Sequence, residues 1–189
     1  MTSKDSLTLG IPCNTSDWRL FIDSSSKSLK AVLLHNTNQW PSILLAHSVH
    51  MKEEYQDVKI LLSALKYDQF NWEIIGDFKM VAVLMGLQGG FTKFPCYLCL
   101  WDSRNTSLHY EKRTWPLRTG YEVGAHNVKQ EPLVEPRKVL MPPLHIKLGL
   151  IKQFVKQLDP EGEALKYIQK LFPKLSEAMI NAGLFVAPR

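Results

Sequence analysis

The chain has 189 residues, 45% of them hydrophobic, which suits a packed domain better than a disordered tail. No apolar run approaches the roughly 18 residues that span a bilayer, and residues 1–10 lack the basic and apolar blocks of a signal peptide. We therefore expect a nuclear or cytoplasmic protein without a membrane segment. Three cysteines are too few for a disulfide framework.

The net charge of +5 is distributed unevenly along the chain. Residues 1–102 hold 9 Lys and Arg against 10 Asp and Glu, whereas residues 103–189 hold 14 against 8, so the two parts carry −1 and +6. Basic surfaces gain affinity for DNA because each neutralised phosphate releases counterions. The asymmetry indicates DNA as a partner, although many basic proteins bind no nucleic acid.

Short runs of branched and aromatic residues in the first 50 positions predict three strands, at residues 18–23, 31–34 and 42–46. The serines at 24–26 and the polar residues at 36–39 can form the turns between them. The lengths of the runs suit strands and are short for helices. Together they predict an antiparallel meander.

The pattern then changes from strand to helix spacing. An amphipathic helix is predicted to begin near Glu53, and its apolar stripe consists of Val58, Leu61, Leu62 and Leu65. Residues 72–75 predict a fourth strand, residues 76–77 a break, and residues 78–87 a second helix ended by Gly89-Gly90. This order predicts an α/β fold and matches the opening of the RNase H-like fold, in which the fourth strand pairs parallel to the first.

The second half of the chain is less regular. Residues 103–143 contain several prolines and no sustained period, which predicts a long irregular insertion ordered by metal. Helical periodicity returns from Ile146 to Leu158, before Asp159-Pro160, and a further helix is predicted at 163–172. We divide the chain into the N-terminal part of the core at 1–92, an irregular insertion at 93–143 and a helical extension of it at 144–189.

Two aspartates lie where this topology brings strand ends together. Asp23 ends the central strand and Asp77 follows the neighbouring parallel strand. Two carboxylates there could share Mg²⁺ or Mn²⁺ ions, which stabilise the attacking and leaving oxygens of phosphoryl transfer. Either aspartate alone would more often cap a strand end or a turn. The topology favours the metal site.

A ribonuclease H of retroelement type would need a further glutamate on the first helix, facing the metals. The middle of the predicted helix is apolar, which argues against an enzyme that cuts RNA. Glu53 and Glu54 remain substitutes, but at the helix start they more simply favour the helix dipole.

The spacing Cys96-x-x-Cys99 predicts two thiolate ligands of a tetrahedral zinc site. His109 and His126 lie in the same irregular stretch and could contribute the other ligands, but neither has a closely spaced histidine partner. A redox role is disfavoured because the motif follows Phe94-Pro95 within a loop. Two buried cysteines without a ligand are the alternative.

Three stretches carry a resemblance to a known group of proteins. WRLFIDSS at 18–25, CYLCLWDSR at 96–104 and LHIKLG at 144–149 resemble transposon-derived proteins that recur in invertebrate genomes. More distantly, an aspartate followed 19 positions later by C-x-x-C and then by a Leu-His-x-x-x-Gly helix is similar to Transib transposases and their recombination-activating relatives. Asp77 and Cys96 keep that interval (96 − 77 = 19).

The resemblance implies a role for each matching position. Asp23 and Asp77 would be the first two acids of a DDE triad, Cys96 and Cys99 half of a zinc site in a helical insertion, and His145 a residue near the active site. In those relatives a histidine pair completes the zinc site and a glutamate beyond it is the third acid. The chain has neither, so we expect a truncated copy, a fragment or a split gene product.

The ancestral activity implied is metal-dependent DNA cleavage and strand transfer. We expect the isolated chain to be inactive because the third acidic residue is missing. DNA is the expected partner, and a homo-oligomer is left open. The alternative function is a non-catalytic, zinc-supported module that binds DNA or another protein.

Overall fold

Two compact units, Met1–Met141 and Pro142–Arg189, make up the chain in the computed structural model. The structure describes residues 14–25, 28–173 and 179. Unit 1 is an α/β domain built on a sheet whose strands are partly parallel. Unit 2 contains helices. Among the described residues, no helix is both long and apolar enough to cross a bilayer.

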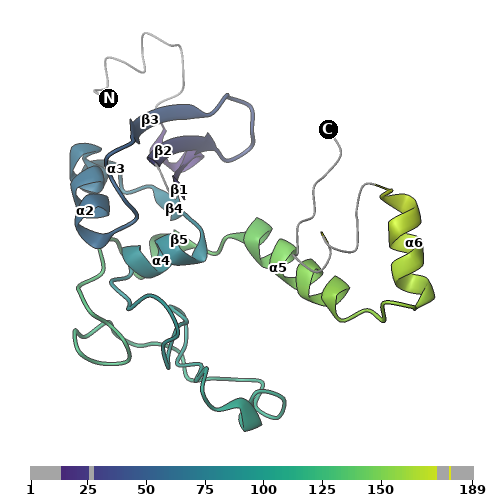
Figure 1. Ribbon diagram of the computed structural model, residues 1–189. Coiled ribbons are helices and arrows are strands. Elements are labelled where there is room, and N and C mark those ends of the chain that lie inside the picture. The colour runs from purple at the N-terminus through teal and green to yellow at the C-terminus, as the bar shows by residue number, and fades with distance from the viewer. Residues whose placement is uncertain (1–13, 26–27, 174–178, 180–189) are drawn as a thin grey trace. The chain divides into compact units, whose positions relative to one another are not determined.

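The sheet of unit 1 has the strand order β3-β2-β1-β4-β5 among the described residues (Figure 1). Its strands are β1 (Trp18–Ser25), β2 (Ser28–His35), β3 (Ile43–Ser48), β4 (Glu73–Ile75) and β5 (Val139–Leu140). The first three pair antiparallel, and β4 pairs parallel to both β1 and β5. The predicted meander and the predicted parallel fourth strand are therefore confirmed.

Helices connect and cover these strands. They are η1 (Thr15–Asp17), α2 (Tyr55–Ala64), α3 (Tyr67–Phe70), α4 (Phe78–Leu84), η2 (Thr106–Leu108) and η3 (Pro136–Lys138). The predicted amphipathic helix corresponds to α2, and its stripe is buried at Val58, Leu61 and Leu62.

Helix α4 is shorter than predicted. It ends at Leu84 because Gly86 adopts a left-handed conformation with φ of 62°, which turns the chain. Leu87 then forms an isolated antiparallel bridge with Val128. The prediction that Gly89-Gly90 ends this helix was therefore wrong.

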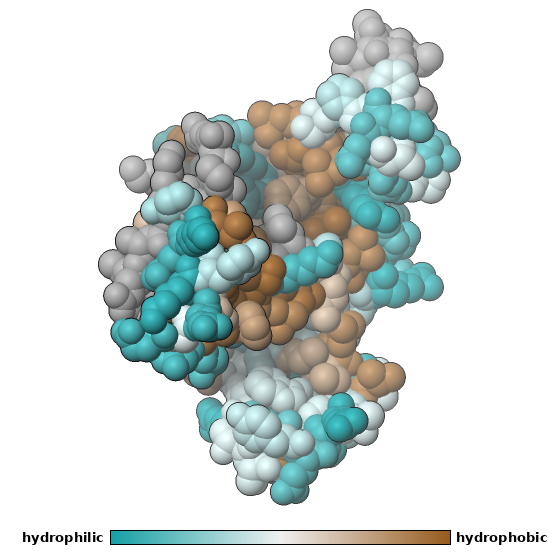
Figure 2. Space-filling view, turned by 90° about the vertical axis from the view of Figure 1, so that its right-hand side faces the viewer, coloured by the Kyte–Doolittle hydropathy of each residue, from teal (hydrophilic) through white to brown (hydrophobic). Residues whose placement is uncertain are grey.

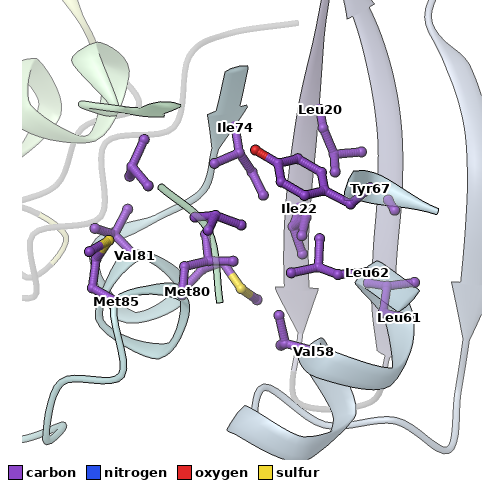
Figure 3. Packing of buried hydrophobic residues seen from close by; sticks show 14 of the residues in the cluster. Leu20, Ile22, Val58, Leu61, Leu62, Tyr67, Ile74, Met80, Val81 and Met85 are labelled. Atoms are coloured by element: carbon purple, nitrogen blue, oxygen red, sulfur yellow. The ribbon is translucent and has the colours of Figure 1, made fainter. Parts of the chain in front are cut away.

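One face of the sheet carries the core of unit 1. Leu20, Ile22 and Ile74 point to this face and are fully buried. Figure 3 shows how side chains of α2, α3 and α4 pack against them, including Val58, Leu62, Tyr67, Met80 and Val81. Burial of each such side chain contributes about 1.5 to 3 kcal/mol. The alternate residues of β1, Arg19 and Phe21, point to the other face and stay partly exposed.

Strand β5 and helix α3 were not predicted. Strand β5 falls within the stretch expected to be irregular, and it joins the sheet through Ile74↔Val139 and Ile75↔Leu140. A strand of two residues is too short to show alternation, so no periodicity indicates it. Elsewhere in 103–143 the structure has turns and short 3-10 segments, as predicted.

Unit 2 contains α5 (Pro143–Lys156) and α6 (Glu163–Leu171), which confirms both predicted helices. Helix α5 begins earlier than its apolar stripe, with proline in its first turn, where a missing N–H costs nothing. Val155 and Leu165 form a small buried cluster between the two helices. Apolar residues of α5 that remain exposed are Leu148, Leu150, Ile151 and Phe154. Figure 2, coloured by hydropathy, shows hydrophobic residues at the surface of the face in view.

Candidate functional site

The register between β1 and β4 relates the two predicted catalytic aspartates. Arg19 pairs with Glu73 and Phe21 pairs with Ile75, with a constant offset of 54 positions. Asp23 and Asp77 have the same offset (77 − 23 = 54): Asp23 lies two residues after Phe21 in β1, and Asp77 lies two residues after Ile75, past the end of β4. We call the end of the sheet where they lie the carboxylate edge.

Gly76 shows that the two segments remain close beyond the last paired residues. A Cβ atom added to Gly76 would lie 3.4 Å from the backbone oxygen of Ile22. Ile22 and Gly76 are the next partners in the register, so the backbones still run side by side immediately before the two aspartates. The added Cβ would also lie 2.6 Å from Cγ of Met80, so only glycine fits here without displacement.

Asp23 belongs to the sheet face opposite the core, whereas Asp77 lies past the end of β4, at the start of α4. Side chains alternate along β1, so Asp23 shares a face with Arg19 and Phe21. On that face Arg19 Nε donates to Glu73 Oε2 at 3.1 Å, which shows that side chains at paired positions of β1 and β4 meet. Asp23 is exposed and Asp77 is half-buried. Both are accessible to a cation from solvent.

Asp77 also has a structural role. Its Oδ1 accepts a hydrogen bond of 2.7 Å from the backbone N–H of Met80, and Asp77 is the N-cap of α4. The capping interpretation is therefore correct for one oxygen. Oδ2 makes no hydrogen bond to the described residues, and the cap fixes where that oxygen points. Capping and cation binding are compatible here.

Glu53 forms an ion pair with Lys79 in the first turn of α4, which the sequence did not predict. Its Oε2 binds Lys79 Nζ at 2.7 Å, and its side chain is only 7% exposed. The other oxygen, Oε1, is buried and has no hydrogen-bond partner among the described residues. The hydrogen bond to Glu53 raises the pKa of Lys79, and the negative charges of Asp77 and Glu54 add to this effect. Three carboxylates therefore act on one ammonium group.

Cys96 and Cys99 lie on a hairpin-like segment, which we call the cysteine arm (residues 93–121). Cys99 bridges antiparallel to Leu117, and Arg118 N donates to Leu98 O at 2.9 Å. Burial and a hydrogen bond with Cys96 raise the pKa of the Cys99 thiol, so both thiols are close to each other. The C-x-x-C spacing does bring the two sulfurs together, as a zinc site requires.

Arg118 organises the cysteine arm. Its guanidinium donates to the carbonyl oxygens of Cys96 at 3.0 and 3.3 Å, Phe94 at 3.2 Å and His126 at 3.1 Å. Burial lowers the pKa of Arg118, and Tyr121 and the two thiols partly offset that. Nothing in the sequence pattern distinguishes this arginine, because its partners are backbone atoms.

The candidate histidine ligands lie apart from the two sulfurs. His109 stacks on Trp101 with 4.8 Å between ring centroids, and its Nε2 lies 2.7 Å from the carbonyl oxygen of Asp102. His126 packs edge-on against Phe94. Within the described part of the chain, no group of three or more His, Cys, Asp or Glu side chains is arranged to hold a metal. His145 falls in α5, and its side chain lies outside the described residues.

Comparison with known proteins gives family matches without a function. Residues 6–134 match the model of a domain of unknown function (DUF8703), and residues 143–189 match that of a second one (DUF8704). A search of curated proteins found no match.

Proposed function

This chain belongs to the DUF8703 family, and we propose that it is a transposase-derived domain with an RNase H-like core. Asp23 and Asp77 would bind a catalytic Mg²⁺ or Mn²⁺ ion that acts on DNA phosphodiesters. The observation that carries the proposal is the parallel register of β1 and β4, which supports two carboxylates at one sheet end. Parallel pairing of sequence-distant strands needs a helical crossover, and α2 and α3 provide it here.

The chemistry of two neighbouring aspartates suits phosphoryl transfer. Their short side chains hold hard oxygen ligands close to rigid backbone, as Mg²⁺ and Mn²⁺ prefer. The ion would polarise a phosphate oxygen and activate water, and then a DNA 3′-hydroxyl, as nucleophile. The +6 charge of residues 103–189 favours contact with the phosphate backbone.

The isolated chain is expected not to complete strand transfer. Its proposed relatives use a glutamate after a histidine pair, and the 189 residues contain no such arrangement. An RNA-cutting function is less favoured, because Val58, Leu61 and Leu62 of α2 are buried apolar residues where a glutamate facing the metals would be needed.

Cation binding tests the proposal directly. We expect Mn²⁺ to stabilise the folded chain and so to raise its melting temperature. At a hundredfold excess of Mn²⁺ over Kd, the gain in the free energy of unfolding is about 2.7 kcal/mol. Asp23→Asn and Asp77→Asn should each abolish most of this gain. Asparagine is a good N-cap, so Asp77→Asn removes the charge and keeps the cap of α4.

The matched control is Asp68→Asn, an exposed acid in α3, before β4 begins. It should respond to Mn²⁺ as the unmodified chain does. Equal Mn²⁺ affinity in the unmodified chain and in both edge variants, measured by titration calorimetry, would overturn the cation site.

A zinc-supported binding module is the second candidate function. It is favoured by the proximity of the Cys96 and Cys99 thiols on one hairpin. Metal analysis of the purified chain distinguishes the two candidates. Stoichiometric zinc that is lost on Cys96→Ser, together with no response to Mn²⁺, would favour the module over the nuclease-like edge.

A further inference from the structure

The cysteine arm carries exposed aromatic and basic side chains at residues 101–115, a segment that we call the arm tip. We propose that the arm tip binds unpaired bases of single-stranded DNA, with its rings stacked on the bases and its Lys and Arg side chains against the phosphates. This inference rests on the proposed function, since it names the form of DNA that the chain would hold. It concerns residues other than those of the carboxylate edge, so the two can be tested separately.

The large aromatic residues of the arm tip lie outside the core. Trp101, Tyr110 and Trp115 are not members of the buried cluster of unit 1, although they include two of the five tryptophans of the chain. Tyr110 is 96% exposed, and both tryptophans are half-buried. Single exposed apolar residues are common, but three large rings within one short segment indicate a surface that binds a partner.

Ring contacts hold part of this surface in place. His109 stacks on Trp101 at an interplanar angle of 29°, and Trp115 packs edge-on against His109 with 6.3 Å between ring centroids. The hydrogen bond between His109 Nε2 and Asp102 O fixes the middle ring. The three rings are therefore ordered before a ligand binds, which reduces the entropy that is lost on binding.

Tyr110 differs from these three rings. Within the described part of the chain, its side chain makes no ring contact and no hydrogen bond. An aromatic ring that is open to solvent can stack on a base, and such stacking tolerates any base because every base has a π-face. Tyr110 is therefore the residue on which we expect an unpaired base to stack.

Positive charge accompanies the rings. The arm has five Lys and Arg against two acids, a net charge of 5 − 2 = +3. Arg104, Lys112 and Arg113 of the tip are exposed, and none of them forms a salt bridge among the described residues. Lys112 Nζ lies 4.5 Å from the centroid of the Trp115 ring, so a cation and a ring share one surface. A polyanion that also presents flat rings is complementary to this combination.

Single-stranded DNA fits the arm tip better than duplex DNA does. In a duplex the bases stack on one another, so a protein contacts only phosphates and the edges of bases in the grooves. Helix η2 (Thr106–Leu108) of the tip has three residues, which is too short to read the major groove. In a single strand the faces of the bases are free to stack on aromatic side chains.

The competing explanation is that the rings only stabilise the arm. Trp101, His109 and Trp115 contact one another and could have that role alone. Tyr110 separates the two explanations, because its exposed ring stabilises nothing that the structure shows. Tyr110→Ala removes the ring and Tyr110→Phe keeps it. The matched control is Tyr167→Ala, which removes a tyrosine of α6 that is 62% exposed.

The experiment measures the affinity of the full chain for DNA by fluorescence anisotropy, without divalent metal. The probe is a labelled thymidine oligonucleotide of about 16 nucleotides, the upper end of the site size of one single-strand-binding fold. Tyr110→Ala should raise Kd by at least about fivefold, the lower end of what one stacked base contributes. Tyr110→Phe and Tyr167→Ala should each change Kd by less than about twofold, because both keep the stacking ring. A duplex of the same length should bind more weakly than the single strand.

Arg113→Met tests the phosphate contacts. Each contact to a phosphate of a single strand contributes about 0.7 to the slope of log Kd against log salt, so this variant should lower the slope by about that amount. Lys30→Met, which removes an exposed lysine of β2, should leave the slope unchanged. A slope in Arg113→Met equal to that of the unmodified chain would overturn the phosphate contact assigned to Arg113.

The outcomes separate this inference from the proposed function. If Tyr110→Ala binds the oligonucleotide as tightly as the unmodified chain, or if the duplex binds as tightly as the single strand, the inference is overturned. Tighter binding of a uridine oligonucleotide would assign the surface to RNA and overturn it as well. Asp23→Asn and Asp77→Asn should bind the oligonucleotide normally while losing the response to Mn²⁺. If the arm tip fails and the Mn²⁺ response is intact, the carboxylate edge stands.

Discussion

The carboxylate edge and the cysteine arm belong to the same unit, but different interactions position their residues. At the edge, the backbone register of β1 and β4 determines which side chains are neighbours. In the arm, one guanidinium bound to three carbonyl oxygens holds the chain around Cys96. The edge therefore depends on a repeating hydrogen-bond pattern between strands, whereas in the arm side chains, Arg118 foremost, supply many of the polar contacts to the backbone.

Because of this difference, the carboxylate edge and the cysteine arm should differ in how well they tolerate substitutions. A strand ladder distributes its stabilisation over many backbone bonds, so a surface substitution at Asp23 or Asp77 should leave the fold intact. In the arm, Arg118 makes four hydrogen bonds to three carbonyl oxygens, and a partly buried carbonyl left without a donor is costly. Function at the edge can be removed without unfolding, but the arm is expected to lose order when its central contact is lost.

The largest effect is expected where the two regions join. Gly86 follows α4, and its carbonyl oxygen accepts from the N–H groups of Lys129 and Gln130 on the segment that returns from the arm. In Gly86→Ala the new Cβ would lie 2.1 Å from Gln130 O, at a φ of 62°. We expect a loss of more than about 3 kcal/mol of stability by denaturant unfolding.

Gly124→Ala is the control for the backbone conformation. It has a φ of 91° and nothing within 4 Å of the added Cβ, so it should cost only about 1 to 2 kcal/mol. If both substitutions lower stability equally, the contact of Gly86 with the segment at Lys129 and Gln130 does not hold the carboxylate edge and the cysteine arm together.

Arg118→Met should have the next largest effect, restricted to the arm. It leaves the carbonyl oxygens of Phe94, Cys96 and His126 without their donor. Hydrogen bonds from charged groups contribute about 1.5 to 3 kcal/mol each, less where solvent can replace them. We expect a loss of about 2 to 3 kcal/mol.

Hydrogen exchange locates this loss. The amides of Leu100 and Arg118 each donate a hydrogen bond across the arm, and in Arg118→Met they should exchange faster. The exchange rates of the Leu20 and Ile22 amides in β1 should be unchanged. The exposed Arg113→Met is the control. Faster exchange throughout β1 would mean that the arm supports the sheet, and that the two regions are not held independently.

The same distinction explains what the sequence could predict. The short runs of branched and aromatic residues and the helical stripe of Val58, Leu61 and Leu62 are local signals, and the meander, the crossover and the parallel strand follow from them. Asp23 and Asp77 could be related because Asp23 ends one predicted strand and Asp77 lies two residues after another. The end of α4 was wrong because three glycines lie close together, and only the structure shows that Gly86 is the one with the left-handed turn.

The residues that escaped prediction act through non-periodic contacts. Arg118 binds backbone carbonyls, so its partners have no residue type to recognise. Glu53 was assigned a simple helix-dipole role, since its distance to Lys79 depends on how α2 and α4 pack. Strand β5 has two residues and pairs with β4 across a long irregular segment. None of these could be predicted without the tertiary structure.

The smallest expected effect concerns a single side-chain hydrogen bond in the core that packs against the sheet. Tyr67 is 5% exposed, and its hydroxyl donates to Trp72 O at 2.7 Å. Tyr67→Phe leaves that carbonyl without its donor and should cost about 1 to 2 kcal/mol at neutral pH, less than Arg118→Met with its four bonds. Tyr110→Phe, at an exposed position, should cost nothing measurable.

The pH dependence tests a second property of Tyr67, the burial of its hydroxyl. Burial, then the charges of Glu135 and Asp68, raises the pKa of Tyr67 from 10.0 to about 12. The folded state therefore holds the proton more tightly than the unfolded chain does, and stability that is present below pH 10 is lost as the pH rises toward 12. This loss is on the order of 2 kcal/mol in the unmodified chain and absent in Tyr67→Phe. The stability deficit of the variant should consequently shrink across that interval in urea titrations, whereas a deficit that stays constant from pH 9 to 12 would show that burial does not raise the pKa of Tyr67.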